Sequence, residues 1–224
     1  MKILAIGEDR RYQELNQKLG SNHSIQRAYH PGEEDLSEFD IIFDLNFDDD
    51  YENIKLYSTL KNTLVFVSAV KTTLNEISYS LGERIHCILV GMNAIPGFIN
   101  RNRWELSLLH FPQKKQVEDI LSAIEVEADW CKDRVGMITP RILFMIINEA
   151  TYTLQEGTAS VKDIDIAMKL GTNYPYGPFE WADKIGITDV FETLHALYKD
   201  SKEERYKISP LLKEYYLKNQ AFIR

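Results

Sequence analysis

Histidine is the side chain best suited to take up a proton near neutral pH, and this chain has 5 of them. They are His23, His30, His86, His110 and His195. None is spaced as HxxxH or grouped with Cys87 and Cys131, the only cysteines, so the sequence predicts no metal site. We interpret His86, within a predicted strand, as a core or edge residue, and His110 has no recognisable catalytic partner.

The N-terminal residues are typical of the first unit of a nucleotide-binding sheet. Residues 1–7, MKILAIG, form a continuous apolar run that ends in glycine, as a parallel strand covered on both faces does. A helix over 11–19 and a strand over 25–29 would complete a β-α-β unit. In a dinucleotide-binding protein, the turn after the first strand carries the spacing GxGxxG, so that the backbone can approach the pyrophosphate.

Here that turn reads Gly7-Glu8-Asp9-Arg10-Arg11-Tyr12. Only Gly7 is retained, and two carboxylates stand where anionic phosphates would lie, although Arg10 and Arg11 could partly offset them. The second predicted strand ends in Tyr-His-Pro and not in the acidic residue that would bind a ribose. We therefore predict a structural Rossmann-like turn in preference to a working NAD site, with Gly7 as the remaining cofactor-binding candidate.

Further buried strands are predicted over 39–45, 63–70, 85–90, 104–109 and 127–133, with helices over 51–60, up to Leu81 and over 113–124. The residues that follow read as helices. In the first, Thr139 is the expected N-cap, Pro140 the first position and Gly157 the end, and an apolar stripe marks the expected buried face: Ile138, Ile142, Met145, Ile146, Ala150 and Leu154. Ser160, Thr188 and Ser209 are expected to cap later helices.

The fold class is therefore α/β, a truncated Rossmann-like doubly wound sheet (1–133) followed by an all-α domain (134–224). Residues 163–186, DIDIAMKLGTNYPYGPFEWADKIG, describe two helices joined by a stiff turn over 173–177. Gly171 is predicted to end the first helix and Pro178 to begin the second, because glycine adopts the left-handed conformation and proline fits a first helical turn. This string resembles the start of the C-terminal domain of the 3-hydroxyacyl-CoA dehydrogenases, DIDxAMxxGxxYPxGPFExxxDxxG.

The resemblance implies an NAD-dependent oxidoreductase whose general base is a histidine held by a glutamate. The family segment LHFFNPxP matches residues 89–96, LVGMNAIP, so that Val90 takes the histidine position and Asn93 the asparagine position. Valine cannot accept or donate a proton, and losing a general base typically costs ~10²–10⁴ in rate. Glu105 is the candidate for the glutamate if a short insertion is allowed.

The resemblance also locates candidates for substrate binding. The family's asparagine near the start of the first long C-terminal helix falls at Pro140, beside a retained Arg141. A serine-rich turn that contacts substrate becomes Lys-Thr-Thr, where Thr72 or Thr73 could stand in. Asn93 and Arg141 could hold a ligand or could equally be fold-supporting hydrogen bonders. Since the family dimerises through its C-terminal domain, a homodimer is implied as well.

Composition narrows the range of partners. The formal charge of −8, from 34 acidic and 26 basic residues, argues against a general nucleic-acid binder or anionic-membrane binder. The run at residues 48–50 is expected to be a solvated turn. No apolar run approaches the ~20 residues that span a bilayer, and the N-terminus starts with a strand pattern instead of a signal peptide. The presence of two cysteines fits a reducing compartment. We therefore expect a cytoplasmic protein.

Three functions stay open. The first is a divergent family member that binds an acyl-CoA or related ligand without NAD chemistry, and the second is an active 3-hydroxyacyl-CoA dehydrogenase with a rearranged site. The third is a non-catalytic dimeric interaction protein, for which four aromatic residues could form a partner surface, although core packing is an alternative role for them: Tyr174, Tyr176, Phe179 and Trp181.

Overall fold

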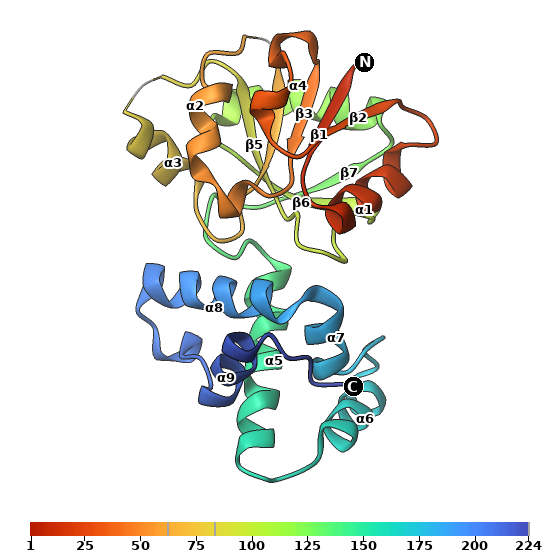
Figure 1. The fold of residues 1–224 in the computed structure, drawn as a ribbon, viewed down its shortest axis with the longest axis vertical. Coiled ribbons are helices and arrows are strands. Elements are labelled where there is room, and N and C mark those ends of the chain that lie inside the picture. Colours follow the sequence, from red (N-terminus) through yellow and green to blue (C-terminus); the bar gives the residue numbers. More distant parts are fainter. Residues whose placement is uncertain (62, 83, 224) are drawn as a thin grey trace. The chain divides into compact units, whose positions relative to one another are not determined.

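The computed structural model describes residues 1–61, 63–82 and 84–223, and it divides the chain into two compact units, Met1–Met137 and Ile138–Arg224 (Figure 1). The division falls after Met137, whereas the sequence pattern placed it after Asp133. The first unit is an α/β unit and the second is helical, which confirms the predicted fold class.

The described residues of the first unit form a 7-stranded sheet in the order β2-β1-β3-β4-β5-β6-β7. Its strands are β1 Ile3–Ile6, β2 Ile25–Ala28, β3 Ile41–Asp44, β4 Leu64–Ser68, β5 Ile88–Met92, β6 Arg103–Leu108 and β7 Glu127–Trp130. Strands β1 to β5 are parallel, β6 is antiparallel to β5, and β7 is parallel to β6. The strand order reverses between β1 and β3, which is where sheets of this type form a ligand crevice.

Two apolar layers cover the sheet. One lies under α1 (Asp9–Leu19) and α4 (Lys114–Ala123), and the other under α2 (Ile54–Tyr57) and α3 (Leu74–Leu81). In the first layer the rings of Phe43 and Phe66 stack with centroids 4.8 Å apart, and Trp104 meets both rings edge-on. Aromatic pairs of this kind contribute packing energy beyond the area they bury.

Two predicted elements of this unit differ clearly in extent. The helix expected over 51–60 is a 3-10 turn, Tyr51–Asn53, followed by the single turn of α2. Strand β5 starts at Ile88 and runs to Met92, so the exposed His86 precedes it and is not part of a strand. Between β2 and β3 the chain forms two 3-10 turns, Pro31–Glu33 and Leu36–Glu38.

The helical unit contains α5 Thr139–Gln155, α6 Val161–Thr172, α7 Pro178–Ile185, α8 Ile187–Ser201 and α9 Pro210–Lys218. The predicted caps Ser160 and Ser209 are confirmed, because each hydroxyl accepts a backbone N–H of the first helical turn. Four predictions were wrong by one or two positions: Thr139 and Thr188 lie inside their helices, Pro140 is the second and not the first residue of α5, and Gly171 lies within α6. Helix α6 ends at Thr172, and the φ of 55° at Asn173 shows that this asparagine supplies the left-handed C-cap.

The buried face of α5 is not the predicted stripe. Ile142 is 61% exposed, whereas the helix buries Leu143, Phe144 and Ile147 together with the polar residues Asn148 and Thr151. The two polar residues fit in the core because both bond to Ser209: the Asn148 amide oxygen accepts its N–H at 2.9 Å, and the Thr151 hydroxyl lies 2.6 Å from its hydroxyl. Of the predicted stripe only Ala150 is buried, so hydrophobicity alone did not identify the buried face of the helix.

Among the described residues, no helix combines the length and apolar character needed to cross a membrane.

Candidate functional site

Val90, at the family's histidine position, lies in the middle of β5 with no exposed surface. It pairs with Phe66 on one side and Leu108 on the other. Its side chain belongs to the apolar layer that also contains Trp104. The position is therefore part of the packed core, where a valine contributes to sheet stability and to no proton transfer.

Asn93 and Glu105 lie side by side, because the antiparallel register that pairs Met92 with Leu106 places them just beyond that pair. The Asn93 backbone N–H donates to the Glu105 carbonyl oxygen at 3.1 Å, and the Asn93 amide nitrogen lies 3.4 Å from the Glu105 carboxylate. The Asn93 side-chain oxygen accepts the N–H of Ile95 at 3.3 Å. The structure thus brings two predicted site residues together. Asn93 is only 3% exposed, and its hydrogen bonds stabilise the turn that follows β5.

Cys131, half-buried, lies in the electrostatic field of the same glutamate. Burial, together with the nearby carboxylates of Glu105 and Asp133, raises the pKa of the Cys131 thiol to about 11. The thiol stays protonated near neutral pH, so it cannot act as a nucleophile there.

Thr72 and Thr73 belong to a capping box at the start of α3. The Thr73 hydroxyl accepts the N–H of Glu76 at 3.1 Å, and the Glu76 carboxylate accepts the N–H of Thr73 at 3.3 Å. The Thr72 hydroxyl lies 3.4 Å from the same carboxylate. Asp133 occupies the remaining donors at this helix end, because its carboxylate accepts the N–H groups of Leu74 and Asn75 at 2.8 and 2.9 Å. The backbone N–H groups of Thr73, Leu74 and Asn75 at this turn are therefore bonded to carboxylates of the chain itself.

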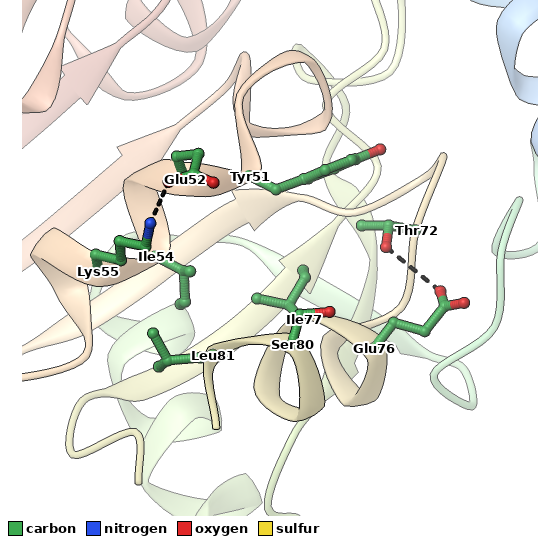
Figure 2. Close-up of a pocket in the computed structure, with 9 residues that line it drawn as sticks. All are labelled: Tyr51, Glu52, Ile54, Lys55, Thr72, Glu76, Ile77, Ser80 and Leu81. Atoms are coloured by element: carbon green, nitrogen blue, oxygen red, sulfur yellow. Dashed lines mark hydrogen bonds and ion pairs between the residues drawn. The ribbon is translucent and has the colours of Figure 1, made fainter. Parts of the chain in front are cut away.

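A small pocket of about 140 Å³ opens between α3 and the residues around α2 (Figure 2). Ile54, Ile77 and Leu81 line its apolar part, and Thr72 and Glu76 stand at its polar end, joined by their hydrogen bond. Pockets for drug-sized ligands usually measure ~300–1,000 Å³. The pocket is thus too small for an acyl-CoA, although it places Thr72 beside an opening.

The turn at Gly7 is tightly packed. A Cβ on Gly7 would lie 2.9 Å from the Asn46 side-chain oxygen, and that same oxygen accepts the N–H of Glu8 at 3.1 Å. Arg11, only 3% exposed, donates to the carbonyl oxygen of Leu45, the residue after β3, at 2.6 Å. Its guanidinium also lies 3.4 Å from the Glu8 carboxylate.

This arrangement does not fit a bound dinucleotide. A Rossmann site offers the pyrophosphate free N–H groups and glycines at this turn. Here one of those N–H groups is bonded to Asn46, Arg11 fills the crevice, and the carboxylates of Glu8 and Asp9 stand at the position of the phosphates. Gly7 therefore serves close packing against Asn46 and not approach to a cofactor.

Arg141 and Pro140 both serve the helical unit. The Arg141 guanidinium donates to the Tyr206 hydroxyl at 3.0 Å and lies 5.9 Å from the centre of that ring. Pro140 is buried near the start of α5. The sequence left open whether Arg141 binds a ligand or supports the fold, and these contacts with Tyr206 are of the fold-supporting kind.

The residues that carry the resemblance have structural roles in the helical unit. The Asp165 carboxylate accepts the N–H groups of Phe179 and Glu180 at 2.8 and 3.2 Å, and the Lys169 ammonium lies 2.6 Å from Glu180. The ring centroids of Tyr176 and Trp181 lie 4.9 Å apart. Phe179, which is fully buried, packs with its ring centroid 4.6 Å from that of Phe222.

Two buried aspartates were missed by the sequence reasoning. Asp48, expected in a solvated turn, is 5% exposed and accepts the Ser68 hydroxyl at 2.6 Å and the N–H groups of Val70 and Lys71 at 2.9 and 2.8 Å. Asp44 accepts the Tyr57 hydroxyl at 2.7 Å.

Burial raises the pKa of both the Asp44 and the Asp48 carboxyl groups to about 6, against the opposing effect of these hydrogen bonds. In the sequence, the only signal for Asp44 and Asp48 is that they lie at the end of a predicted buried strand or just after it. Among the described residues no group of three or more His, Cys, Asp and Glu could hold a metal ion.

Comparisons with known proteins show what the helical unit is similar to. Residues 136–221 match the model of the 3-hydroxyacyl-CoA dehydrogenase C-terminal domain. The chain is 46% identical over 82 residues to 3-hydroxyadipyl-CoA dehydrogenase of Escherichia coli K12, which covers 37% of this chain and 17% of that protein. It is 43% identical over 84 residues to 3-hydroxybutyryl-CoA dehydrogenase of Bradyrhizobium diazoefficiens, covering 38% and 29%. The matched segments therefore span less than a third of these two relatives.

Solved structures share the fold across both units. The structure of FadB2 from M. tuberculosis has a TM-score of 0.75 at 14% identity, with 98% of this chain and 94% of that chain covered. (S)-3-hydroxybutyryl-CoA dehydrogenase PaaH1 from Ralstonia eutropha gives 0.73 at 18% identity, with 97% and 93% covered.

These likenesses show the fold of the chain, a Rossmann-like sheet unit followed by a helical unit. Within this fold, the helical unit is similar to the C-terminal domain of the 3-hydroxyacyl-CoA dehydrogenases.

Proposed function

We propose that this protein keeps the dehydrogenase fold, lacks the family's hydride-transfer mechanism, and binds an acyl-CoA or a related ligand. The observation that carries the proposal is Val90, because a fully buried valine stands where the reaction needs an imidazole. Neither His86 nor His110 replaces it, since both are exposed and His86 precedes β5. Glu105 then has no histidine to orient and bonds to Asn93 instead.

The ligand class comes from the relatives, which are named as dehydrogenases of 3-hydroxyadipyl-CoA and 3-hydroxybutyryl-CoA. A retained ligand site without the chemistry would make the protein a binder or sensor of such thioesters. Calorimetric titration with acetoacetyl-CoA tests the binding, and NADH oxidation with acetoacetyl-CoA tests the chemistry. We expect saturable binding and no turnover above background, measured beside an active 3-hydroxybutyryl-CoA dehydrogenase. Turnover would instead show an active dehydrogenase with a rearranged site.

A homodimer through the helical unit is part of the proposal. An apolar groove of about 410 Å³ lies between α5 and α6, with Ile146, Ala150, Ile164 and Met168 in its walls. Leu170 on α6 is 83% exposed, so its side chain is accessible to a partner subunit.

The same surface favours a second candidate, a non-catalytic dimeric interaction protein. Dimerisation without binding of any CoA ester would select this candidate. The free thiols of Cys87 and Cys131 are compatible with the cytoplasmic location that we also propose.

A further inference from the structure

Arg27 forms the centre of a cluster at the carboxyl end of β2. Its guanidinium lies 2.5 Å from the Asp9 carboxylate and donates to the carbonyl oxygen of Gly7 at 3.2 Å. The ring centres of Tyr12 and Tyr29 lie 4.7 and 4.4 Å from the guanidinium carbon. We call these residues, Gly7, Asp9, Tyr12, Arg27 and Tyr29, the Arg27 cluster.

The cluster contains two kinds of interaction. The ion pair with Asp9 lowers the pKa of that carboxyl group, through its hydrogen bond and charge interaction with Arg27. Stacking on two aromatic rings uses the flat guanidinium plane, which a lysine does not have. The Arg27 side chain is 23% exposed, although it carries a full charge. The arginine is therefore held in a single position by groups that come from the end of β1, from α1 and from the end of β2.

That position matters because of its place in the fold. In a dinucleotide-binding sheet the pyrophosphate lies at the N-terminus of the helix after the first strand, and the adenosine ribose lies at the end of the second strand. The Arg27 side chain runs from β2 to Asp9, the first residue of α1, and to the end of β1. It thus spans the interval that the ribose and pyrophosphate would occupy. On the other side of β1, Asn46 and Arg11 fill the crevice toward β3.

We propose that the protein fills its own dinucleotide position: the Arg27 cluster on one side of β1, and Arg11 with Asn46 on the other, replace a bound NAD and exclude it. The inference deepens the proposed function by naming what closes the cofactor site. A pyrophosphate would have to displace the Asp9 carboxylate from Arg27 while lying beside Glu8, and the Glu8 N–H it needs is already bonded to Asn46.

The test combines binding and stability measurements on the full chain. Titration of the wild-type protein with NADH, followed by nucleotide fluorescence, should show no saturation up to millimolar concentration. Arg27→Ala should lower the thermal midpoint by several degrees, and Arg27→Lys should lower it by a substantial part of that amount, because lysine keeps the charge and loses the stacking.

Arg103→Ala is the matched control, since Arg103 also pairs with a carboxylate, Asp129 at 2.5 Å, but is more exposed and lies at the other end of the sheet. Its effect on the thermal midpoint should be clearly smaller than that of Arg27→Ala. Equal effects of the two alanine variants would overturn the proposal, as would saturable NADH binding at micromolar concentration. NADH binding without turnover would contradict the exclusion of NAD but not the proposed function. Failure of acetoacetyl-CoA to bind would contradict the proposed function but not the exclusion of NAD.

Discussion

The carboxyl group of Asp165 lies directly against Gly177: a Cβ on this glycine would lie only 2.2 Å from the Asp165 carboxyl carbon. The aspartate reaches this position to accept the N–H groups of Phe179 and Glu180, which are otherwise free at the start of α7. Gly177 is therefore required by packing and not by its φ of −72°, which any residue adopts. Much of the family motif in this chain thus describes how α6 joins α7.

Gly177→Ala should destabilise the protein by about 1–3 kcal/mol, the usual cost of overpacking a well-packed site. Urea unfolding followed by circular dichroism measures this change. Gly171→Ala is the matched control, because Gly171 lies inside α6 and an added Cβ would meet no other group within 4 Å. That variant should gain up to about 1 kcal/mol, since alanine favours the helix. Equal stabilities of the two variants would contradict the packing role of Asp165.

Stability should depend on pH through Asp44. Its carboxyl has a pKa of about 6 in the folded protein, above the value of 3.8 expected when exposed. Between these two values the folded state binds more protons than the unfolded state, so the free energy of unfolding falls as pH rises from about 4 to about 6.

Asp44→Asn should remove this share of the pH dependence, of the order of 3 kcal/mol at ~1.4 kcal/mol per pH unit. Guanidinium unfolding at several pH values between 4 and 7 measures the difference between wild type and variant. Asp40→Asn, which removes an exposed carboxylate just before the start of β3, is the control for the loss of one negative charge. A parallel pH profile for wild type and Asp44→Asn would rule out the role of Asp44.

The sequence predicted the order of elements well, because buried strands and capped helices leave strong local patterns, as at Ser160 and Ser209. It failed where tertiary bonds override hydrophobicity. Asn148 and Thr151 are buried because Ser209, far away along the chain, offers them partners, and no local pattern shows this.

The candidate site was predictable in part for a related reason. Asn93 and Glu105 meet because of the register between β5 and β6. The sequence did not determine this register, since the assignment of Glu105 depended on a short insertion. The position of Arg27 in the nucleotide region went unnoticed because its partners come from separate elements, the end of β1, α1 and the end of β2. An arginine on a short strand has no sequence signal of its own.

Introducing the missing imidazole should not restore the family reaction. Val90→His would place a polar ring among Phe66, Leu108 and Trp104 in a site with no exposed surface, at a cost of about 2–5 kcal/mol in stability. NADH oxidation with acetoacetyl-CoA should stay at background, and the unfolding midpoint in urea should fall. Val90→Ile, which keeps the apolar character, is the control for added volume. Measurable turnover by the histidine variant would show that β5 presents this position to a bound substrate.

The proposed homodimer makes a prediction about the exposed surface of α6. Leu170→Glu should shift the protein from dimer to monomer in sedimentation velocity at micromolar concentration, because burying a carboxylate in an apolar interface costs several kcal/mol unless it is paired. The control is Leu217→Glu on α9, whose side chain is 70% exposed and is not among the residues that line the groove between α5 and α6. This variant should stay dimeric, and both should retain wild-type helix content by circular dichroism. A wild-type protein that sediments as a monomer, or a Leu170→Glu variant that stays dimeric, would place the dimer interface elsewhere or remove it.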